Sequence, residues 1–237
     1  MSDAVVFQGL NALDFEEIRA SVVRIPEVTR RIMEAQRIWD SSEASHFDFF
    51  NFIASEDRVF MSNIRLKSLA AAVVQVGLYE RFLRYHKPPQ IIVGNANGDS
   101  ALKVAAGILT FEEMVSQSAA LKLTRPVAPL QLADAPVLSG ISLTEYGAYR
   151  SAKDDNGESV MDEISVDKID PAKIIATLVE EHDVRSFTNV GPGNLLYPQL
   201  EEDLKMADIQ VVESIEMDPM LSWFWTGMRS RDFAVAQ

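Results

Sequence analysis

The sequence predicts an α/β protein of three layers, in which helices cover both faces of a mostly parallel β-sheet. The first observation behind this prediction is that short apolar runs alternate with helical patterns along the chain. The second is the composition of the 237 residues, which are 47% hydrophobic and 24% charged, as in ordinary globular proteins. A chain of this length can bury a core without disulfide bonds, and we expect one domain spanning residues 1–237.

Proline and capping residues mark the helix ends in the first half of the chain. Pro26 suits the first turn of a helix, whereas Pro88 ends the longest helical pattern. Thr110 is expected to cap a further helix, whose first turn contains Glu112 and Glu113. The predicted elements are a strand at 4–7, helices at 26–39 and 64–86, a strand at 90–93, and helices at 100–106 and after 110.

In the second half of the chain, the turn-forming residues at 154–157 indicate a loop or a hairpin, and they are flanked by Tyr149 and Val160. Asp170 followed by Pro171 is a typical helix start. Two prolines within 124–129 indicate a connector. The remaining predicted elements are strands at 136–143, 184–190 and 208–215, a helix from 170 to near 183, and a final helix from 218.

The charge balance restricts the partners of the protein. With 35 acidic and 22 basic residues, the formal net charge is −13, which argues against binding the nucleic-acid backbone. No window approaches the ~20 uncharged apolar residues of a membrane span. The N-terminus has no basic region followed by an apolar run, so we expect no signal peptide and a cytoplasmic protein.

The composition also restricts the chemistry. The chain has no cysteine, which excludes disulfides, a thiolate nucleophile and cysteine-ligated metal clusters. His46, His86 and His182 lie far apart in the sequence, and no carboxylate stands at ligand spacing around them. We therefore expect no metal site and no cofactor.

The most informative motif is a predicted strand followed by Gly94-x-Ala96-x-Gly98 and then a helix. This pattern is typical of a nucleophile elbow, in which glycines permit a tight turn that lifts one side chain above the sheet edge. In an active enzyme the middle residue is a serine, and backbone N–H groups at the helix start stabilise the oxyanion. Here the middle residue is Ala96, which has no nucleophilic atom.

Residues 94–102 and 105–113 read Gly-Asn-Ala-Asn-Gly-Asp-Ser-Ala-Leu and Ala-Ala-Gly-Ile-Leu-Thr-Phe-Glu-Glu. They resemble the malonyl-CoA:acyl carrier protein transacylase family, whose motif Gly-His-Ser-Leu-Gly-Glu is followed by an Ala-rich helix and an Ala-Gly pair. Residues 6–9, 135–139, 189–193 and 218–219 resemble further family segments in the same order. The resemblance implies the large subdomain of this fold, with the ferredoxin-like small subdomain deleted near 123–130.

The resemblance also implies that the family's active site has been lost. Ala96 stands at the position of the acyl-accepting serine and Asn95 at that of the neighbouring histidine. Leu10 replaces the glutamine of the oxyanion loop, and Leu121 falls where the family has the arginine that pairs with the malonyl carboxylate. The catalytic histidine of the family belongs to the missing subdomain. Loss of these groups together leaves no route through an acyl-enzyme.

Two other interpretations of the elbow stay open. Ser100 follows Ala96 by about one helical turn and would be a relocated nucleophile with Asp99 nearby, although a first-turn polar residue is the simpler interpretation. Asn95, Asn97 and Asp99 form a polar rim that suits an anion or water, although asparagine also suits the backbone of tight turns. Together with Leu10, Leu121 and Ala96, they define a degenerate binding cleft.

Aromatic and acidic clusters have structural explanations. Four phenylalanines within 47–52 are expected to belong to the core, and the acidic run at 201–203 to a solvated helix face. The three aromatic residues at 223–225 cannot all face inward from one helix, so at least one is expected to be exposed or to contact a partner.

The sequence therefore predicts a non-catalytic acyltransferase-like protein with a binding or assembly role, in fatty-acid or polyketide metabolism. The alternatives are an active acyl-CoA:acyl carrier protein transacylase or hydrolase with a relocated nucleophile, and a structural subunit that dimerises. The family suggests an acyl carrier protein or acyl-CoA as partner, but acidic carriers would repel this chain unless a basic patch intervenes. Lys122 with Arg125, and Arg81 with Arg84, are the local candidates, and neither pair makes a convincing patch. We expect a homodimer, the commonest assembly of soluble oligomers.

Overall fold

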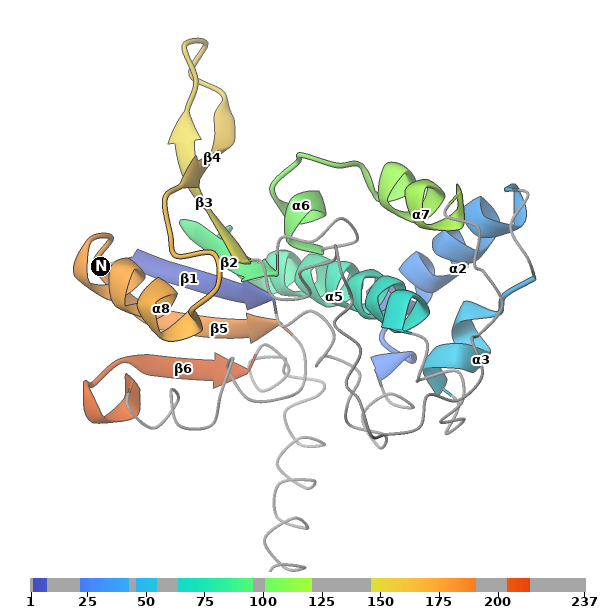
Figure 1. The fold of residues 1–237 in the computed structure, drawn as a ribbon, viewed down its shortest axis with the longest axis horizontal. Helices are drawn as coiled ribbons and strands as arrows, with labels where there is room; N and C mark the ends of the chain where they lie inside the picture. Colours follow the sequence, from blue (N-terminus) through green and yellow to red (C-terminus); the bar gives the residue numbers. More distant parts are fainter. Residues whose placement is uncertain are drawn as a thin grey trace, which may run out of the picture.

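The computed structural model describes residues 2–7, 22–42, 46–54, 64–95, 101–120, 146–190 and 204–213. Their centre is a six-stranded sheet in the order β4-β3-β2-β1-β5-β6 (Figure 1). The strands are β1 (Ser2–Phe7), β2 (Ile91–Asn95), β3 (Tyr146–Lys153), β4 (Ser159–Ile164), β5 (Val184–Val190) and β6 (Gln210–Glu213).

The sheet is mostly parallel, as the sequence predicts. Strand β1 pairs in parallel with both β2 and β5, and β5 pairs in parallel with β6. Strands β3 and β4 form an antiparallel hairpin on the side of β2, and β3 is antiparallel to β2. The predicted turn at 154–157 connects these two strands, so the hairpin signal in the sequence is confirmed.

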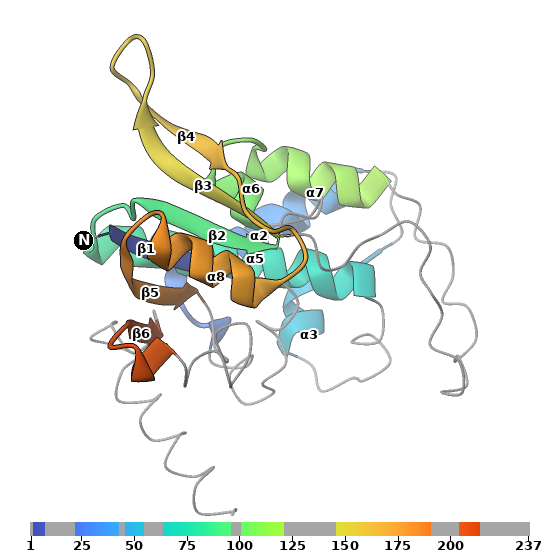
Figure 2. The ribbon, with the colours of Figure 1, turned by 60° about the vertical axis from the view of Figure 1, so that its left-hand side comes forward.

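Helices cover both faces of the sheet and give the three predicted layers (Figure 2). Alternate strand residues point to opposite faces: Val5 and Ile92 pack against one helical layer, whereas Val6 and Ile91 pack against the other. The second layer is formed by α8 (Pro171–Glu180). The first layer contains α2 (Pro26–Asp40), α3 (Phe49–Ala54), α5 (Ile64–Tyr85), α6 (Ala101–Ala105) and α7 (Phe111–Ala120).

Local capping explains where two of the helices begin. The hydroxyl of Thr110 accepts a hydrogen bond from the Glu113 N–H at 3.1 Å, and the Glu113 carboxylate accepts one from the Thr110 N–H at 2.8 Å. These reciprocal bonds form a capping box at the start of α7, and the bond from the Thr110 backbone lowers the pKa of Glu113. Asp170 caps α8 by accepting from the Ala172 N–H at 3.0 Å. Both predicted caps are confirmed.

The phenylalanine cluster is mostly core, as expected. The side chains of Phe47, Phe49 and Phe52 are buried, and the rings of Phe47 and Phe49 meet edge to face at 4.7 Å. Trp39 of α2 packs against the same rings. Phe50 differs, with 49% of its surface exposed. The buried residues of α3 are Phe49, Phe52 and Ile53, and Phe50 lies on the other side of this short helix.

Several sequence predictions lie outside the described residues. They are the connector at 124–129, the strand at 136–143, the acidic run at 201–203, the helix from 218 and the aromatic cluster at 223–225. The single domain over 1–237 and the deletion near 123–130 stay predictions. Among the described helices, none is both long enough and apolar enough to cross a membrane.

Candidate functional site

The carboxyl ends of β1, β2 and β5 lie at one edge of the sheet, since the three strands are parallel. The chain leaves β1 for β2 through helices on one face and reaches β5 through α8 on the other face. The strand order therefore reverses at β1. In open α/β sheets, ligands bind beside the carboxyl ends of strands at such a switch point. This edge is the candidate functional site.

The predicted elbow lies at this edge. Strand β2 ends at Asn95 and α6 begins at Ala101, so residues 96–100 connect a strand to a helix as the motif requires. The strand runs two residues further than the predicted 90–93, because Gly94 and Asn95 pair with Gly147 and Tyr146 of β3. The first glycine of the motif is therefore part of the sheet.

Gly94 has a steric reason to be glycine. A Cβ atom at this position would lie 2.5 Å from the carbonyl oxygen of Phe7 and 2.8 Å from its Cβ atom. Real Cβ atoms essentially never make contacts this short, so a side chain would force β1 and β2 apart. The glycine thus serves the approach of two strands, whatever chemistry the elbow carries.

A buried glutamine connects helix α5 to the same edge. The amide Nε2 of Gln75 donates a hydrogen bond to the carbonyl oxygen of Val190 at 3.2 Å, and the residue is 1% exposed. Val190 is the last residue of β5 and precedes the predicted Gly-Pro-Gly turn at 191–193. Sequence reasoning missed Gln75, although a lone amide within the apolar run at 69–79 was the available signal.

Tyr79 of α5 is an unsuitable acid or base for this site. Its ring packs edge to face against Phe7 at 5.2 Å, and burial raises the pKa of Tyr79 to about 12. The phenol therefore stays protonated at neutral pH.

The histidines do not gather at the candidate site. His86 follows α5 and stacks on Phe82 at 4.8 Å, and His182 precedes β5, so both lie toward the amino ends of the strands. His46 is exposed ahead of α3. Within the described ranges, no group of three or more His, Cys, Asp or Glu side chains could hold a metal ion.

The predicted site residues are mostly beyond the described residues. Asn95 is placed as the last residue of β2, at the carboxyl edge. The other predicted positions, Leu10, Ala96, Asn97, Asp99, Ser100 and Leu121, lie outside the described residues. The assignment of these residues to a cleft stays a prediction.

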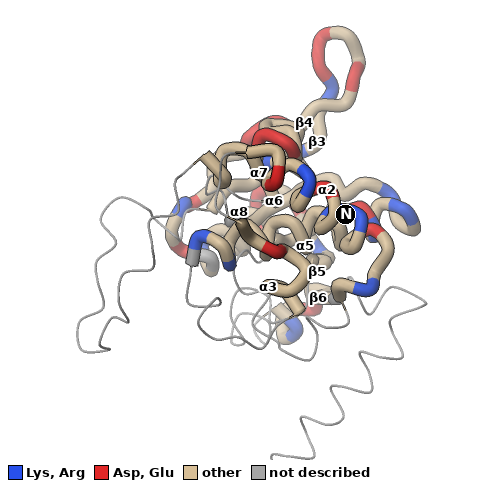
Figure 3. The backbone as a smooth tube through the Cα atoms, turned by 90° about the vertical axis from the view of Figure 1, so that its right-hand side faces the viewer, with Lys and Arg blue, Asp and Glu red and all other residues tan. Residues whose placement is uncertain are grey.

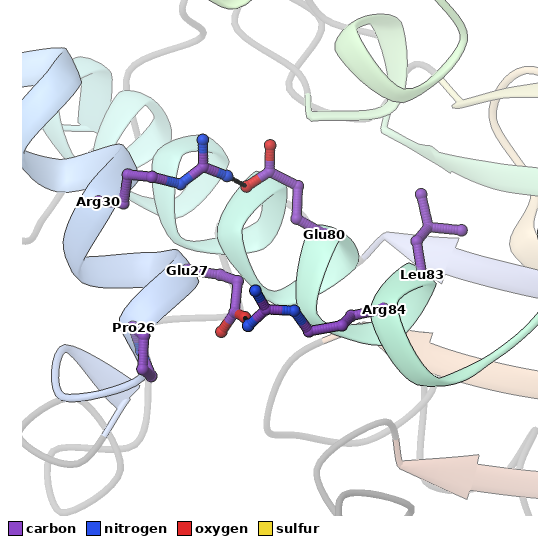
Figure 4. Close-up of a pocket in the computed structure, with 6 residues that line it drawn as sticks. All are labelled: Pro26, Glu27, Arg30, Glu80, Leu83 and Arg84. Carbon is purple, nitrogen blue, oxygen red and sulfur yellow. Dashed lines mark hydrogen bonds and ion pairs between the residues drawn. The ribbon is translucent and has the colours of Figure 1, made fainter.

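A cavity of about 500 Å³ lies away from this edge, between the start of α2 and the end of α5 (Figure 4). It is lined by Pro26, Glu27, Arg30, Glu80, Leu83 and Arg84. Glu27 accepts from Arg81 at 3.3 Å and from Arg84 at 2.5 Å. The predicted basic pair of Arg81 and Arg84 is therefore engaged with a carboxylate of the same chain.

Comparison with solved structures gives the class of fold. Over 89% of this chain and 95% of the other, the chain superimposes on MCAT from Streptococcus pneumoniae with a TM-score of 0.58 and 13% identity. The malonyl CoA-acyl carrier protein transacylase of Coxiella burnetii gives 0.55 and 15%, with 90% and 93% covered. An acyl carrier protein S-malonyltransferase of Vibrio cholerae gives 0.54 and 11%, with 90% and 96% covered.

These likenesses establish an acyltransferase-like α/β fold. More narrowly, the fold is that of the malonyl-CoA:acyl carrier protein transacylases, which confirms the resemblance seen in the sequence at the level of structure. At 11–15% identity they show the fold alone. No protein-family model and no curated protein matches the sequence.

Proposed function

We propose that this chain is a non-catalytic protein with an acyltransferase-like fold and a binding or assembly role, in fatty-acid or polyketide metabolism. The observation that carries the proposal is Ala96. Strand β2 and helix α6 flank the turn in which this fold presents a reacting serine, and the residue in the middle of that turn has only a methyl group. A methyl group can neither attack an acyl carbon nor hold an acyl chain as an ester.

The surroundings of the elbow support the same proposal. An acyl transfer needs a base to take the proton from the nucleophile, and His86 and His182 both lie toward the opposite edge. The glycine that the strands require is present, whereas the groups that the chemistry requires are replaced. We propose Leu10, Asn95, Asn97, Asp99 and Leu121, beside Ala96, as lining of the remaining cleft.

The experiment is acylation of the purified protein. The chain is incubated with a reactive acyl-CoA and, separately, with a serine-directed fluorophosphonate, and intact mass spectrometry detects any adduct. We expect none. A single labelled serine whose replacement by alanine abolishes the adduct would overturn the proposal and favour a relocated nucleophile. Ser100→Ala is the first variant to compare, with Ser116→Ala on the exposed face of α7 as the matched control.

An assembly role favours a protein partner, and a second copy of this chain is the partner we propose. An acyl carrier protein is the weaker proposal, because the solved structures that suggest it are only 11–15% identical to this chain. We also propose a cytoplasmic location for the protein.

A further inference from the structure

The cavity between α2 and α5 is lined by two arginines and two glutamates, so its lining has no net charge. The arginines are nevertheless the more exposed to solvent. We call the six lining residues named above the α2–α5 groove. The Arg30 and Arg84 side chains are 59% and 62% exposed, whereas their partners Glu80 and Glu27 are 23% and 8% exposed. The carboxylates are thus the more buried members of the two ion pairs, and the guanidinium groups are the more exposed ones. Figure 4 shows Arg30 beside Glu80 and Arg84 beside Glu27.

The two guanidinium groups keep donors for a ligand. Within the described part of the chain, Arg30 gives one N–H to Glu80 at 2.6 Å and Arg84 gives one to Glu27 at 2.5 Å. A guanidinium has several further donors in the same plane. The exposed ends of both side chains can therefore bind carboxylates of another molecule while the internal ion pairs remain.

The same surface continues along α2 with a further cation and apolar atoms. Positions 26, 30, 33 and 37 fall within about 60° of the helix surface. Arg37 is exposed, Met33 is 68% exposed, and Leu83 across the groove is 37% exposed. Asp40 is also exposed near this face, and Glu27 and Glu80 lie in the groove, so the net charge of the surface is near zero. Its cations are nevertheless the more exposed groups at the groove, which makes this surface less acidic than a chain of formal charge −13 has on average.

The β3–β4 hairpin has the opposite character. Strand β3 pairs with β2 only as far as Arg150, and beyond it β3 and β4 form a two-stranded ribbon that projects from the sheet (Figure 1). Acidic residues lie on both sides of its tip (Figure 3). Asp155 and Glu158 at the tip are exposed, and Val160 beside them is 37% exposed. Asp162 is exposed too, but it pairs across the strands with Arg150, and Lys153 is exposed below the tip, so the acidic character is greatest at the tip itself. A ribbon of two strands is only marginally stable without a packing partner.

We propose that the β3–β4 hairpin of one copy docks in the α2–α5 groove of a second copy. Two copies of so acidic a chain repel each other unless cations lie at the contact, and the exposed arginines at the groove provide them. The hairpin cannot reach the groove of its own chain, because β3 is held in the sheet by β2. Carboxylates of the hairpin then meet Arg30, Arg37 and Arg84, and Val160 meets Leu83 and Met33.

The contact joins two different surfaces, so two reciprocal contacts close a dimer and a single contact would extend into a chain of copies. The inference deepens the assembly role proposed above and rests on it. The two proposals can be disproved independently. The acylation experiment tests whether the elbow is non-catalytic, whereas the docking experiment measures the molecular mass of the assembly.

The experiment uses sedimentation velocity and light scattering at micromolar concentration in low salt. The wild-type chain is expected to associate, and added salt is expected to weaken the association. Asp155→Lys with Glu158→Lys reverses the charge at the tip of the hairpin, and Arg30→Glu with Arg37→Glu reverses the charge of the exposed arginines at the groove. The groove variant keeps its fold, because Glu80 retains Arg31 and Glu27 retains Arg81 and Arg84. Each variant alone is expected to weaken association at least about tenfold.

Mixing the two variants is the decisive measurement. In the mixture, the lysines of one protein face the glutamates of the other, and the remaining hairpin and groove are both wild type, so association is expected to return. Glu180→Lys with Glu181→Lys, at the exposed end of α8, makes the same change in net charge as the hairpin variant and is expected to have no comparable effect. Circular dichroism confirms that each variant is folded.

Three results would overturn the proposal. The first is a wild-type chain that stays at the mass of one copy at all concentrations. The second is association that the α8 control weakens as much as the hairpin variant does. The third is a pair of weakened variants that fail to associate when mixed.

Discussion

Gly94 and Phe7 face each other across the two central strands at a separation that only glycine allows. A Cβ atom at residue 94 would lie 2.5 Å from the carbonyl oxygen of Phe7, and the obstacle is backbone that cannot rotate away. The same pair marks the carboxyl edge where the candidate elbow begins. The glycine that the motif assigns to a tight turn is thus required by the sheet itself.

Gly94→Ala is expected to lower the free energy of unfolding by about 3 kcal/mol, because β1 and β2 must separate to admit the methyl group. Urea unfolding followed by circular dichroism measures the loss. Gly107→Ala is the control, since residue 107 has a φ of +72° but no atom within 4 Å of an added Cβ. That variant tests backbone strain alone, which costs about 1 kcal/mol. Equal losses in the two variants would show that the strands separate easily.

Gly77 allows a similarly close approach between helices α5 and α2. An added Cβ atom would lie 2.6 Å from the Val28 Cα atom. In an exposed helix, replacing glycine with alanine stabilises by about 1 kcal/mol. Here Gly77→Ala is expected to destabilise by about 2 kcal/mol, because the helices must move apart. A thermal melt that shows a gain in stability would contradict the close helix crossing.

Gln75 is the polar link between helix α5 and the end of β5. Gln75→Leu keeps a similar volume but leaves the buried carbonyl oxygen of Val190 without its donor, and is expected to cost about 1–3 kcal/mol. Relative to wild type, hydrogen exchange in the variant should increase more at the carboxyl end of β5 than at β4. Thr177→Val is the control, because it replaces a polar, half-buried residue with an apolar one on α8, away from Val190. Unchanged exchange near Val190 would contradict the positioning role.

Local patterns predicted most of the fold. The caps at Thr110 and Asp170 and the hairpin at 154–157 depend on residues within a few positions of one another, and each is present in the structure. The mostly parallel sheet follows from strands that alternate with helices. Phe50 was the exception within its cluster, because composition alone does not show which side of a short helix faces the core.

Contacts between distant parts of the chain were not predictable in this way. Arg81 and Arg84 look like a free basic pair in the sequence, since Glu27 lies more than 50 positions earlier. Only the packing of α2 on α5 brings that carboxylate beneath them. The strand and the helix on either side of the predicted elbow were predictable from the sequence, whereas the buried bond from Gln75 to Val190 required the fold.

The buried phenol of Tyr79 is expected to make the stability of the protein depend on pH in the alkaline range. Burial raises the pKa of this phenol to about 12 from its ordinary value of 10.0. Between these values the unfolded chain releases the proton and the folded chain keeps it, so unfolding becomes more favourable as pH rises. Stability from this group is complete below pH 10 and lost on approaching pH 12, by about 3 kcal/mol.

Tyr79→Phe keeps the ring against Phe7 but has no proton to release. The variant is therefore expected to lose less stability than wild type as the pH rises from 10 toward 12, while Tyr85→Phe, at the 51% exposed Tyr85, should follow the wild-type curve. Urea titrations at closely spaced pH values measure the difference, and absorbance near 295 nm reports phenolate formation. Parallel curves for wild type and Tyr79→Phe would mean that the phenol ionises without unfolding, which its burial in the core does not permit.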